Sequence, residues 1–285
     1  MTMSVLALDI GGTAVKYGCF GEETEFGEFS VKDSDGIEHL PEKILGFISK
    51  YNADRVGISV PGPFDFSSGT GLMEHKLKSL YRVSLKEMIG KRFPYTELFF
   101  IHDATAFILG GIYSGSILSN ENVSGVMLGT GLGYVHFADG RVEVNKNKTP
   151  LNPLWNKPYK DGIAENYVSA TAIINKARAK GYLFDGVREI ATAAREGNRE
   201  LAEIFLETGE QLGELVISKQ KEDGFDKLFI GGQVSRAWDL MKPGFETICP
   251  ISYVLSEDPS KCPIWGIKYC AERGMDGIYK EGKEQ

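Results

Sequence analysis

Short apolar runs separated by glycine-rich turns dominate the first sixty residues, a pattern typical of strands joined by tight turns. The first run ends at Asp9, and the second begins just after the turn that holds Gly11 and Gly12. The Pro61-Gly62-Pro63 segment stops a later run sharply. We predict strands at residues 5–10, 15–20, 25–31 and 55–60, and further along at 98–101, 123–128, 134–137 and 227–230.

A second pattern, apolar residues three and four positions apart, predicts amphipathic helices between the strands. Residues 37–51 show it clearly, with Leu40, Ile44 and Ile48 on one face. The other predicted helices cover residues 104–114, 163–179 and 200–219, a stretch after Ser235, and a C-terminal helix from Trp265 that frays into a polar tail. Strands that alternate with helices predict an α/β fold. The arrangement of strand, glycine turn and strand at residues 5–20 recurs at residues 123–137.

Composition adds one anomaly to this picture. Glycine supplies 34 of 285 residues, about 12% against the usual ~7%. These glycines cluster in the turns. The other fractions, 42% hydrophobic and 25% charged, are ordinary for a globular protein. The net charge of −7 and the lack of a long basic run argue against nucleic acid as a partner.

The chain shows no sign of a membrane or an oxidising compartment. Its first twenty residues include Asp9 and Lys16 and lack the order of a signal peptide. No apolar run approaches the ~18 residues of a membrane span. The four cysteines are scattered without a CxxC pair, so we expect buried reduced thiols. These features predict a cytoplasmic protein that has no membrane partner.

Three turns carry glycines next to hydroxyl or amide side chains, at residues 9–13, 129–133 and 231–235. Glycine lets backbone N–H groups approach an anion closely, and Thr13 and Thr130 add hydroxyl donors. A single turn of this kind is more often plain hairpin geometry. Three of them favour a phosphate site. Two other nucleotide motifs are excluded, because no P-loop occurs and the glycines at 129–133 lead into a strand instead of a helix.

The order of these motifs along the chain resembles that of the ROK sugar kinases, members of the actin, hexokinase and heat-shock ATPase superfamily. The matching segments span nearly the whole chain. They are Leu-Asp-Ile-Gly-Gly-Thr at 8–13, Val-Gly-Ile-Ser-Val-Pro-Gly-Pro at 56–63, Asp-Ala-Thr-Ala at 103–106, Leu-Gly-Thr-Gly-Leu-Gly at 128–133 and Ile-Gly-Gly-Gln-Val-Ser at 230–235.

The resemblance implies an α/β fold of two actin-like ATPase (ribonuclease H-like) domains with a cleft between them. Residues 1–108 together with the helix at 265–285 would form the N-terminal domain, and residues 109–264 the C-terminal domain. ATP and Mg²⁺ would be the cofactors, with Asp9 holding the metal through water. The residues implied in phosphate and nucleotide binding are Asp9, Gly11, Gly12, Thr13, Gly129, Thr130, Gly131, Gly231, Gly232 and Gln233.

On the sugar side the resemblance implies that Asp103 is the general base that takes a proton from a sugar hydroxyl. His102 and Glu165 would bind the sugar. Each has a structural alternative. Asp103 also suits a helix N-cap. His102 stands where the family usually has asparagine and could simply pack. Glu165 could be an acid favoured by the dipole of a first helical turn.

The sequence departs from the family where the sugar would bind. Relatives commonly carry a Gly-His pair and a cysteine cluster that holds structural zinc. Residues 145–153 lack both, and no cysteine lies between Cys19 and Cys249, so we expect no zinc. Lys148 is the loosely aligned residue in the place of that histidine.

The function implied is therefore ATP-dependent phosphorylation of a sugar, glucose or another hexose or amino sugar, by a glucokinase-like phosphotransferase. The alternative is a catalytically weak sugar-binding regulatory protein of the same family. Only eight residues precede Asp9, so we expect no DNA-binding segment before it. A homodimer is compatible with the resemblance, since dimers are common among similar proteins.

Overall fold

The computed structural model describes residues 4–31, 40–74 and 77–282. The chain divides into two compact units. The first comprises Met1–Gly115, Arg141–Leu151 and Ser260–Gln285, and the second comprises Ser116–Gly140 and Asn152–Pro259.

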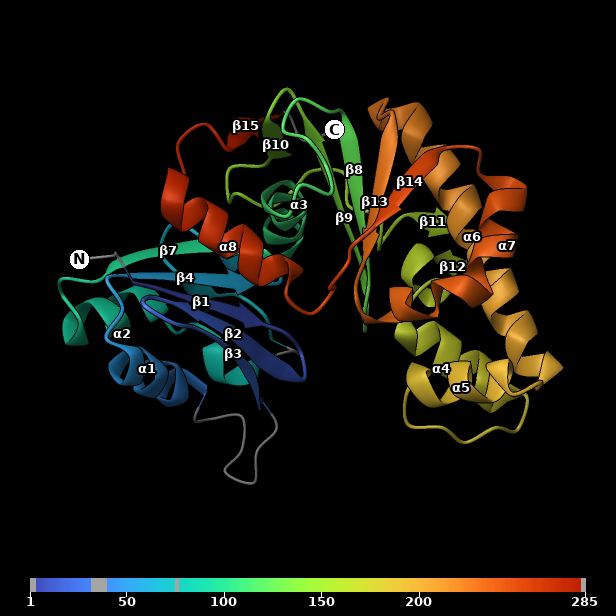
Figure 1. Cartoon of the computed structure of the whole chain (residues 1–285), viewed down its shortest axis with the longest axis horizontal. Coiled ribbons are helices and arrows are strands. Elements are labelled where there is room, and N and C mark those ends of the chain that lie inside the picture. Colours follow the sequence, from blue (N-terminus) through green and yellow to red (C-terminus); the bar gives the residue numbers. More distant parts are fainter. Residues whose placement is uncertain (1–3, 32–39, 75–76, 283–285) are drawn as a thin grey trace. The chain divides into compact units, whose positions relative to one another are not determined.

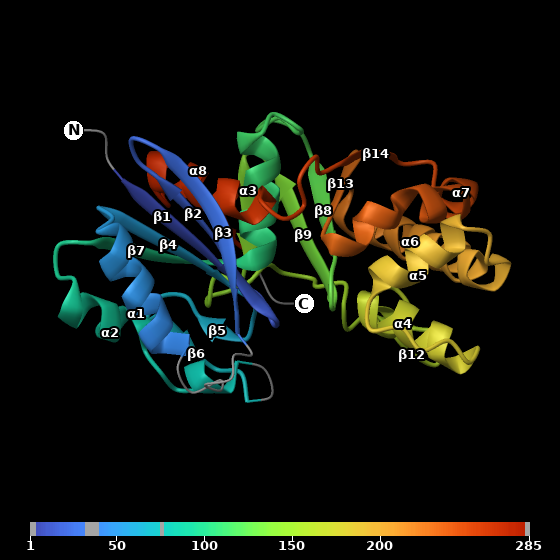
Figure 2. The same ribbon diagram turned by 60° about the horizontal axis from the view of Figure 1, so that its bottom comes forward.

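The first unit is built on a five-stranded mixed sheet (Figure 1). Its strand order is β3 (Thr24–Ser30), β2 (Ala14–Phe20), β1 (Val5–Ile10), β4 (Arg55–Val60) and β7 (Glu97–His102). The strands β1, β4 and β7 are parallel neighbours, whereas β1, β2 and β3 form an antiparallel meander. The helices α1 (Leu40–Tyr51) and α2 (Leu85–Arg92) cover one face (Figure 2). The other face carries α3 (Asp103–Tyr113) and α8 (Cys262–Arg273).

Helices α3 and α8 pack so closely that two glycines are required between them. A Cβ on Gly110 would lie 1.9 Å from the carbonyl oxygen of Cys262, and one on Gly266 would lie 1.8 Å from that of Ala106. Real Cβ atoms do not approach backbone so closely, hence any larger residue would push the helices apart. This contact fixes α3, whose first residue is Asp103.

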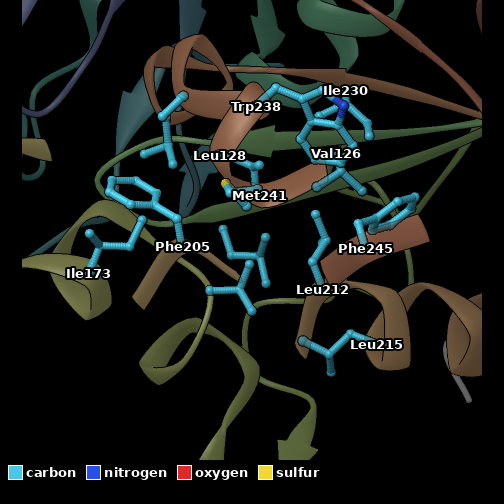
Figure 3. Close-up of a cluster of buried hydrophobic side chains, with 14 of the residues drawn as sticks. Val126, Leu128, Ile173, Phe205, Leu212, Leu215, Ile230, Trp238, Met241 and Phe245 are labelled. Atoms are coloured by element: carbon cyan, nitrogen blue, oxygen red, sulfur yellow. The ribbon is translucent and has the colours of Figure 1, made fainter. Parts of the chain in front are cut away.

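In the second unit, four strands are hydrogen-bonded neighbours in the order β14 (Ser252–Leu255), β13 (Lys227–Gly231), β8 (Val123–Leu128) and β9 (Leu132–Ala138). Its helices are α4 (Ala170–Ala179), α5 (Val187–Arg195), α6 (Arg199–Asp223) and α7 (Trp238–Ile248). The core lies between these strands and helices, where Val126, Ile230, Phe205, Met241 and Phe245 are fully buried (Figure 3).

Smaller elements complete the fold. In the first unit β5 (Phe64–Asp65) pairs with β6 (Thr70–Gly71), and β10 (Arg141–Val144) pairs in parallel with β15 (Tyr279–Glu281). In the second unit β11 (Pro158–Tyr159) pairs with β12 (Gly162–Ile163). Single 3₁₀ turns are η2 (Lys78–Leu80), η3 (Ala164–Asn166) and η4 (Gln233–Ala237). No helix within the described ranges is long and apolar enough to cross a membrane.

The predicted α/β fold and most of its predicted elements are confirmed. The helix predicted at 163–179 is wrong over its first seven residues, because the Ser169 hydroxyl accepts the amide of Ala172 and caps a helix that begins at Ala170. The C-terminal helix begins three residues earlier than predicted, at Cys262, and the tail after it forms β15. The first residues of the helix predicted from position 37 lie outside the described residues.

Candidate functional site

Three polar residues of the first unit lie at the carboxyl ends of neighbouring parallel strands. Asp9 of β1 is in register with Ser59 of β4, and Val60 of β4 is in register with His102 of β7. Asp103 follows directly as the first residue of α3. Carboxyl ends of parallel strands are the usual place for ligands in α/β sheets. The fold thus brings Asp9, His102 and Asp103 to one edge.

Asp9 is the most perturbed acid at this edge. Ser59, itself fully buried, donates its hydroxyl to Asp9 Oδ1 at 2.6 Å. Burial raises the pKa of Asp9 to about 6, although the Ser59 hydrogen bond and the charge of Lys16 oppose the rise. The negative charge of Asp103 adds to it. The fold therefore holds a carboxylate whose charge lacks full compensation, which suits a cation ligand.

This arrangement predicts that Asp9→Asn stabilises the metal-free protein. Asp9 titrates near 3.8 when unfolded and near 6 when folded, so its ionised form disfavours folding fully above pH 6. That penalty shrinks as the pH falls and vanishes below about 4. Denaturant titrations in EDTA should show the variant more stable by roughly 1–3 kcal/mol at pH 7.5 and equal to the wild type near pH 4. Equal free energies of unfolding for the variant and the wild type at pH 7.5 would contradict the predicted cost of burying the ionised Asp9 carboxylate.

His102 and Asp103 share the start of α3. His102 is the N-cap, and its Nδ1 accepts the amide of Ala104 at 3.2 Å. The same nitrogen lies 3.0 Å from Asp103 Oδ1, which accepts the Ala104 amide at 2.7 Å. The other ring nitrogen, Nε2, faces Gly62, where a Cβ would lie 3.4 Å away. The N-cap proposed as an alternative role for Asp103 thus belongs to His102.

Only some of the backbone amides in the turn after β1 form hydrogen bonds within the turn. The Gly11 amide donates to the carbonyl of Ala14 at 2.9 Å, which closes the hairpin. Within the described residues no hydrogen bond uses the amides of Gly12 and Thr13, and both residues are exposed. The turn is therefore a hairpin, and its amides at Gly12 and Thr13 can still donate hydrogen bonds to an anion.

In the second unit, the two remaining glycine turns are neighbours. Gly231 of β13 is in register with Met127 of β8, so the turns after these parallel strands lie side by side. Gly232 has a φ of +86°, and a Cβ there would lie 2.4 Å from the carbonyl oxygen of Leu128. Only glycine fits this position. Gln233 is exposed and opens η4, which leads into α7.

Glu165 lies against the 129–131 turn. Its Oε2 accepts the amide of Leu132 at 2.9 Å and would be 2.3 Å from a Cβ on Gly131. The structural alternative placed Glu165 in the first turn of a helix. It lies instead in the 3₁₀ turn η3, ahead of α4. Its carboxylate is partly exposed.

The predicted site residues therefore form one group in each unit. Sequence reasoning missed Ser59, because a serine in an apolar strand carries no signal until its hydrogen bond to Asp9 is seen. It also missed Thr171, whose hydroxyl donates to the carbonyl of Thr130 at 3.0 Å. Over the described ranges no group of three or more His, Cys, Asp or Glu side chains is placed to hold a metal ion. The expectation of a zinc-free protein stays a prediction.

Two comparisons with known sequences bear on this site. The family model described as the ROK family matches residues 5–147. The glucokinase of Thermotoga maritima is 25% identical over 270 residues, which cover 84% of each chain. The N-acetyl-D-glucosamine kinase of Vibrio cholerae is 29% identical over 150 residues, which cover 49% of this chain and 48% of that protein.

Solved structures share the fold over nearly the full length. A ROK family glucokinase from Streptomyces griseus, solved with glucose and AMPPNP, superposes with a TM-score of 0.75 at 18% identity, covering 95% of this chain and 100% of that one. A ROK family transcriptional regulator, a homologue of the E. coli MLC protein, gives a TM-score of 0.77 at 18% identity, covering 95% and 78%. At these identities the likeness establishes the fold alone.

Proposed function

This chain belongs to the ROK family, and from that premise we propose that it transfers the γ-phosphoryl group of ATP to a hydroxyl of a sugar. The observation that supports the proposal most is the pairing of Asp9 and Asp103 at one sheet edge, where the fold holds two interacting carboxylates. A binding protein has no need of the second one. We assign the two compact units to the two actin-like domains, and the cytoplasm stays the expected location.

The nucleotide side of the proposal rests on backbone donors and one acid. In phosphoryl transfer the protein supplies positioning and charge stabilisation more than covalent chemistry. The amides of Gly12, Thr13, Thr130 and Gly131 have no internal partners within the described residues and suit phosphate oxygens. Gly231, Gly232 and Gln233 would lie near the adenosine.

Mg²⁺ fits the acid that the first unit offers. It binds proteins through one or two carboxylates and keeps several waters. Asp9, an under-compensated carboxylate whose Oδ1 is already bonded to Ser59, matches that requirement through water. When bound, the ion would neutralise charge on the phosphates.

On the sugar side, the proposal gives Asp103, His102 and Glu165 separate roles. Asp103 accepts the proton of the attacking hydroxyl, and its place as the first residue of a tightly packed helix keeps the carboxylate fixed. Nδ1 of His102 already accepts a hydrogen bond from the Ala104 amide at the start of α3, so Nε2 is the nitrogen that binds a sugar hydroxyl. Glu165 contributes a further carboxylate acceptor.

We infer that the substrate is glucose, another hexose or an amino sugar, since the relatives act on glucose and N-acetylglucosamine by name. A coupled assay of ADP release with Mg²⁺ should show stimulation by at least one of glucose, mannose, N-acetylglucosamine and N-acetylmannosamine. A rate that no such sugar raises above the sugar-free background would contradict the kinase proposal.

A sugar-binding regulatory role is the second candidate, because the same fold occurs in a ROK family transcriptional regulator. Thermal shifts with the same sugars distinguish the two. Stabilisation by a sugar without any stimulated ADP release would favour regulation, since a ligand that binds only the folded state raises its stability.

A further inference from the structure

The turn at residues 129–131 is held from outside by one short segment, residues 165–171. The Ala170 amide, the first of α4, donates to the carbonyl of Gly129 at 2.8 Å. The Thr171 hydroxyl donates to the carbonyl of Thr130 at 3.0 Å. Glu165 takes the amide of Leu132 on the far side of the turn. Three backbone groups of the turn and its exit thus have external partners.

These bonds orient the amides that remain. A trans peptide is planar, with its C=O and the following N–H pointing in opposite directions. Because the carbonyls of Gly129 and Thr130 face α4, the amides of Thr130 and Gly131 point away from it. Neither amide has a hydrogen-bond partner within the described residues. The Gly129 amide is used inside the turn, on the carbonyl of Gly131 at 3.0 Å. The result is a pair of donors aimed in one direction.

Ala170 and Thr171 each hold a different peptide group of the turn. Ala170 holds the Gly129–Thr130 peptide through its backbone, which almost any residue would supply. Thr171 holds the Thr130–Gly131 peptide through its side chain, so this contact depends on the residue type. A glycine-rich turn has little steric restraint of its own, and without the hydroxyl the Thr130–Gly131 peptide is restrained only through the hydrogen bonds of its neighbours.

We propose that Thr171 is a positioning residue of the phosphate site, whose hydroxyl fixes the Thr130–Gly131 peptide so that the Gly131 amide faces a phosphate group of the nucleotide. The nature of the ligand rests on the proposed function, whereas the orientation of the turn rests on the hydrogen bonds alone. Thr171 itself touches no ligand and acts through the turn.

The test uses three variants of the full chain and two readouts. Thr171→Val removes the hydroxyl at nearly constant shape, and Thr171→Ser retains it. Thr192→Val is the matched control, because the Thr192 hydroxyl also donates to a backbone carbonyl, that of Arg188, on the exposed side of α5. The readouts are hydrogen exchange of the Gly129 and Leu132 amides without ligand, and calorimetric titration with MgADP.

Thr171→Val should speed exchange of both amides and weaken MgADP binding about two- to tenfold, the loss expected for one hydrogen bond. Thr171→Ser and Thr192→Val should match the wild type in both readouts. Unchanged exchange in Thr171→Val, or failure of serine to restore it, would overturn the positioning role. Faster exchange with unchanged MgADP affinity would overturn the link to phosphate. If the wild type bound no MgADP, the proposed kinase function would fail, and the exchange data would still show whether Thr171 holds the turn.

Discussion

Asp103→Asn should reduce sugar-stimulated ADP release about 10²- to 10⁴-fold, the usual contribution of a general base. The asparagine oxygen can still accept the Ala104 amide that Asp103 Oδ1 accepts, so the start of α3 should survive. What the variant loses is the ability to take a proton from the attacking hydroxyl. MgADP affinity should therefore stay within about twofold of the wild type, because phosphate binding is assigned to other residues.

Asp54→Asn is the matched control for this variant. Asp54 precedes β4 and bonds the amide and hydroxyl of Ser4, at the amino end of the parallel strands, whereas Asp103 follows the carboxyl end of β7. Removing the Asp54 charge should leave the stimulated rate unchanged. If Asp103→Asn retained more than about a tenth of the wild-type rate, Asp103 would not be the base.

The largest effect on stability should come from Asp223→Asn. Lys219 Nζ lies 2.8 Å from Asp223 Oδ2, and the two side chains are only 2% and 6% exposed. Asp223 also accepts the hydroxyl of Tyr134, which contacts the Ser124 hydroxyl at 2.8 Å. Burial, reinforced by the charge of Asp223, holds the pKa of Tyr134 well above its usual value, so the phenol remains a donor.

Losing the Asp223 charge leaves the buried Lys219 ammonium with a single carboxylate partner among the described residues, the half-exposed Glu222 at 3.3 Å. Breaking one side of a buried ion pair typically costs about 3–5 kcal/mol. Glu87→Gln provides the comparison: Glu87 and Lys91 form another i, i+4 pair at 3.6 Å, but their side chains are 72% and 81% exposed. That pair should contribute at most about 0.5 kcal/mol.

Urea unfolding of both variants measures this difference in the free energy of unfolding. The Tyr134 hydroxyl, which donates to Asp223, ties the last turn of α6 to β9, the strand that follows the 129–131 turn, so Asp223→Asn should also weaken MgADP binding. Equal free energies of unfolding for the two variants would contradict the account of this buried network.

Much of the fold follows from local sequence signals. The glycine turns, the strand stops and the apolar spacing of α6 and α8 predict those elements, because each depends on a few neighbouring residues. The start of α4 could not be placed from spacing, since apolar residues at helical spacing already occur at 163, 164, 167 and 168, whereas the Ser169 cap decides where the helix begins. The strand β15 was missed because its polar residues pair with β10, far away in sequence.

The candidate site shows the same division. Asp9, His102 and Asp103 lie at the ends of apolar runs, and the resemblance to the ROK sugar kinases is what selected them as site residues. Ser59 and Thr171 could not be selected in this way, because their roles come from contacts with residues 50 and 41 positions away. The units' assignment as domains and the roles of the chosen residues stay predictions until the variants are measured.

The most direct test of the kinase proposal is the mass of the sugar itself after incubation with the protein, ATP and Mg²⁺. We expect at least one hexose or amino sugar to gain the mass of one phosphoryl group as ADP accumulates in equal amount, and Asp103→Asn to form almost none of this product. ATP consumed without a phosphorylated sugar, or product formed equally by Asp103→Asn, would contradict the proposal.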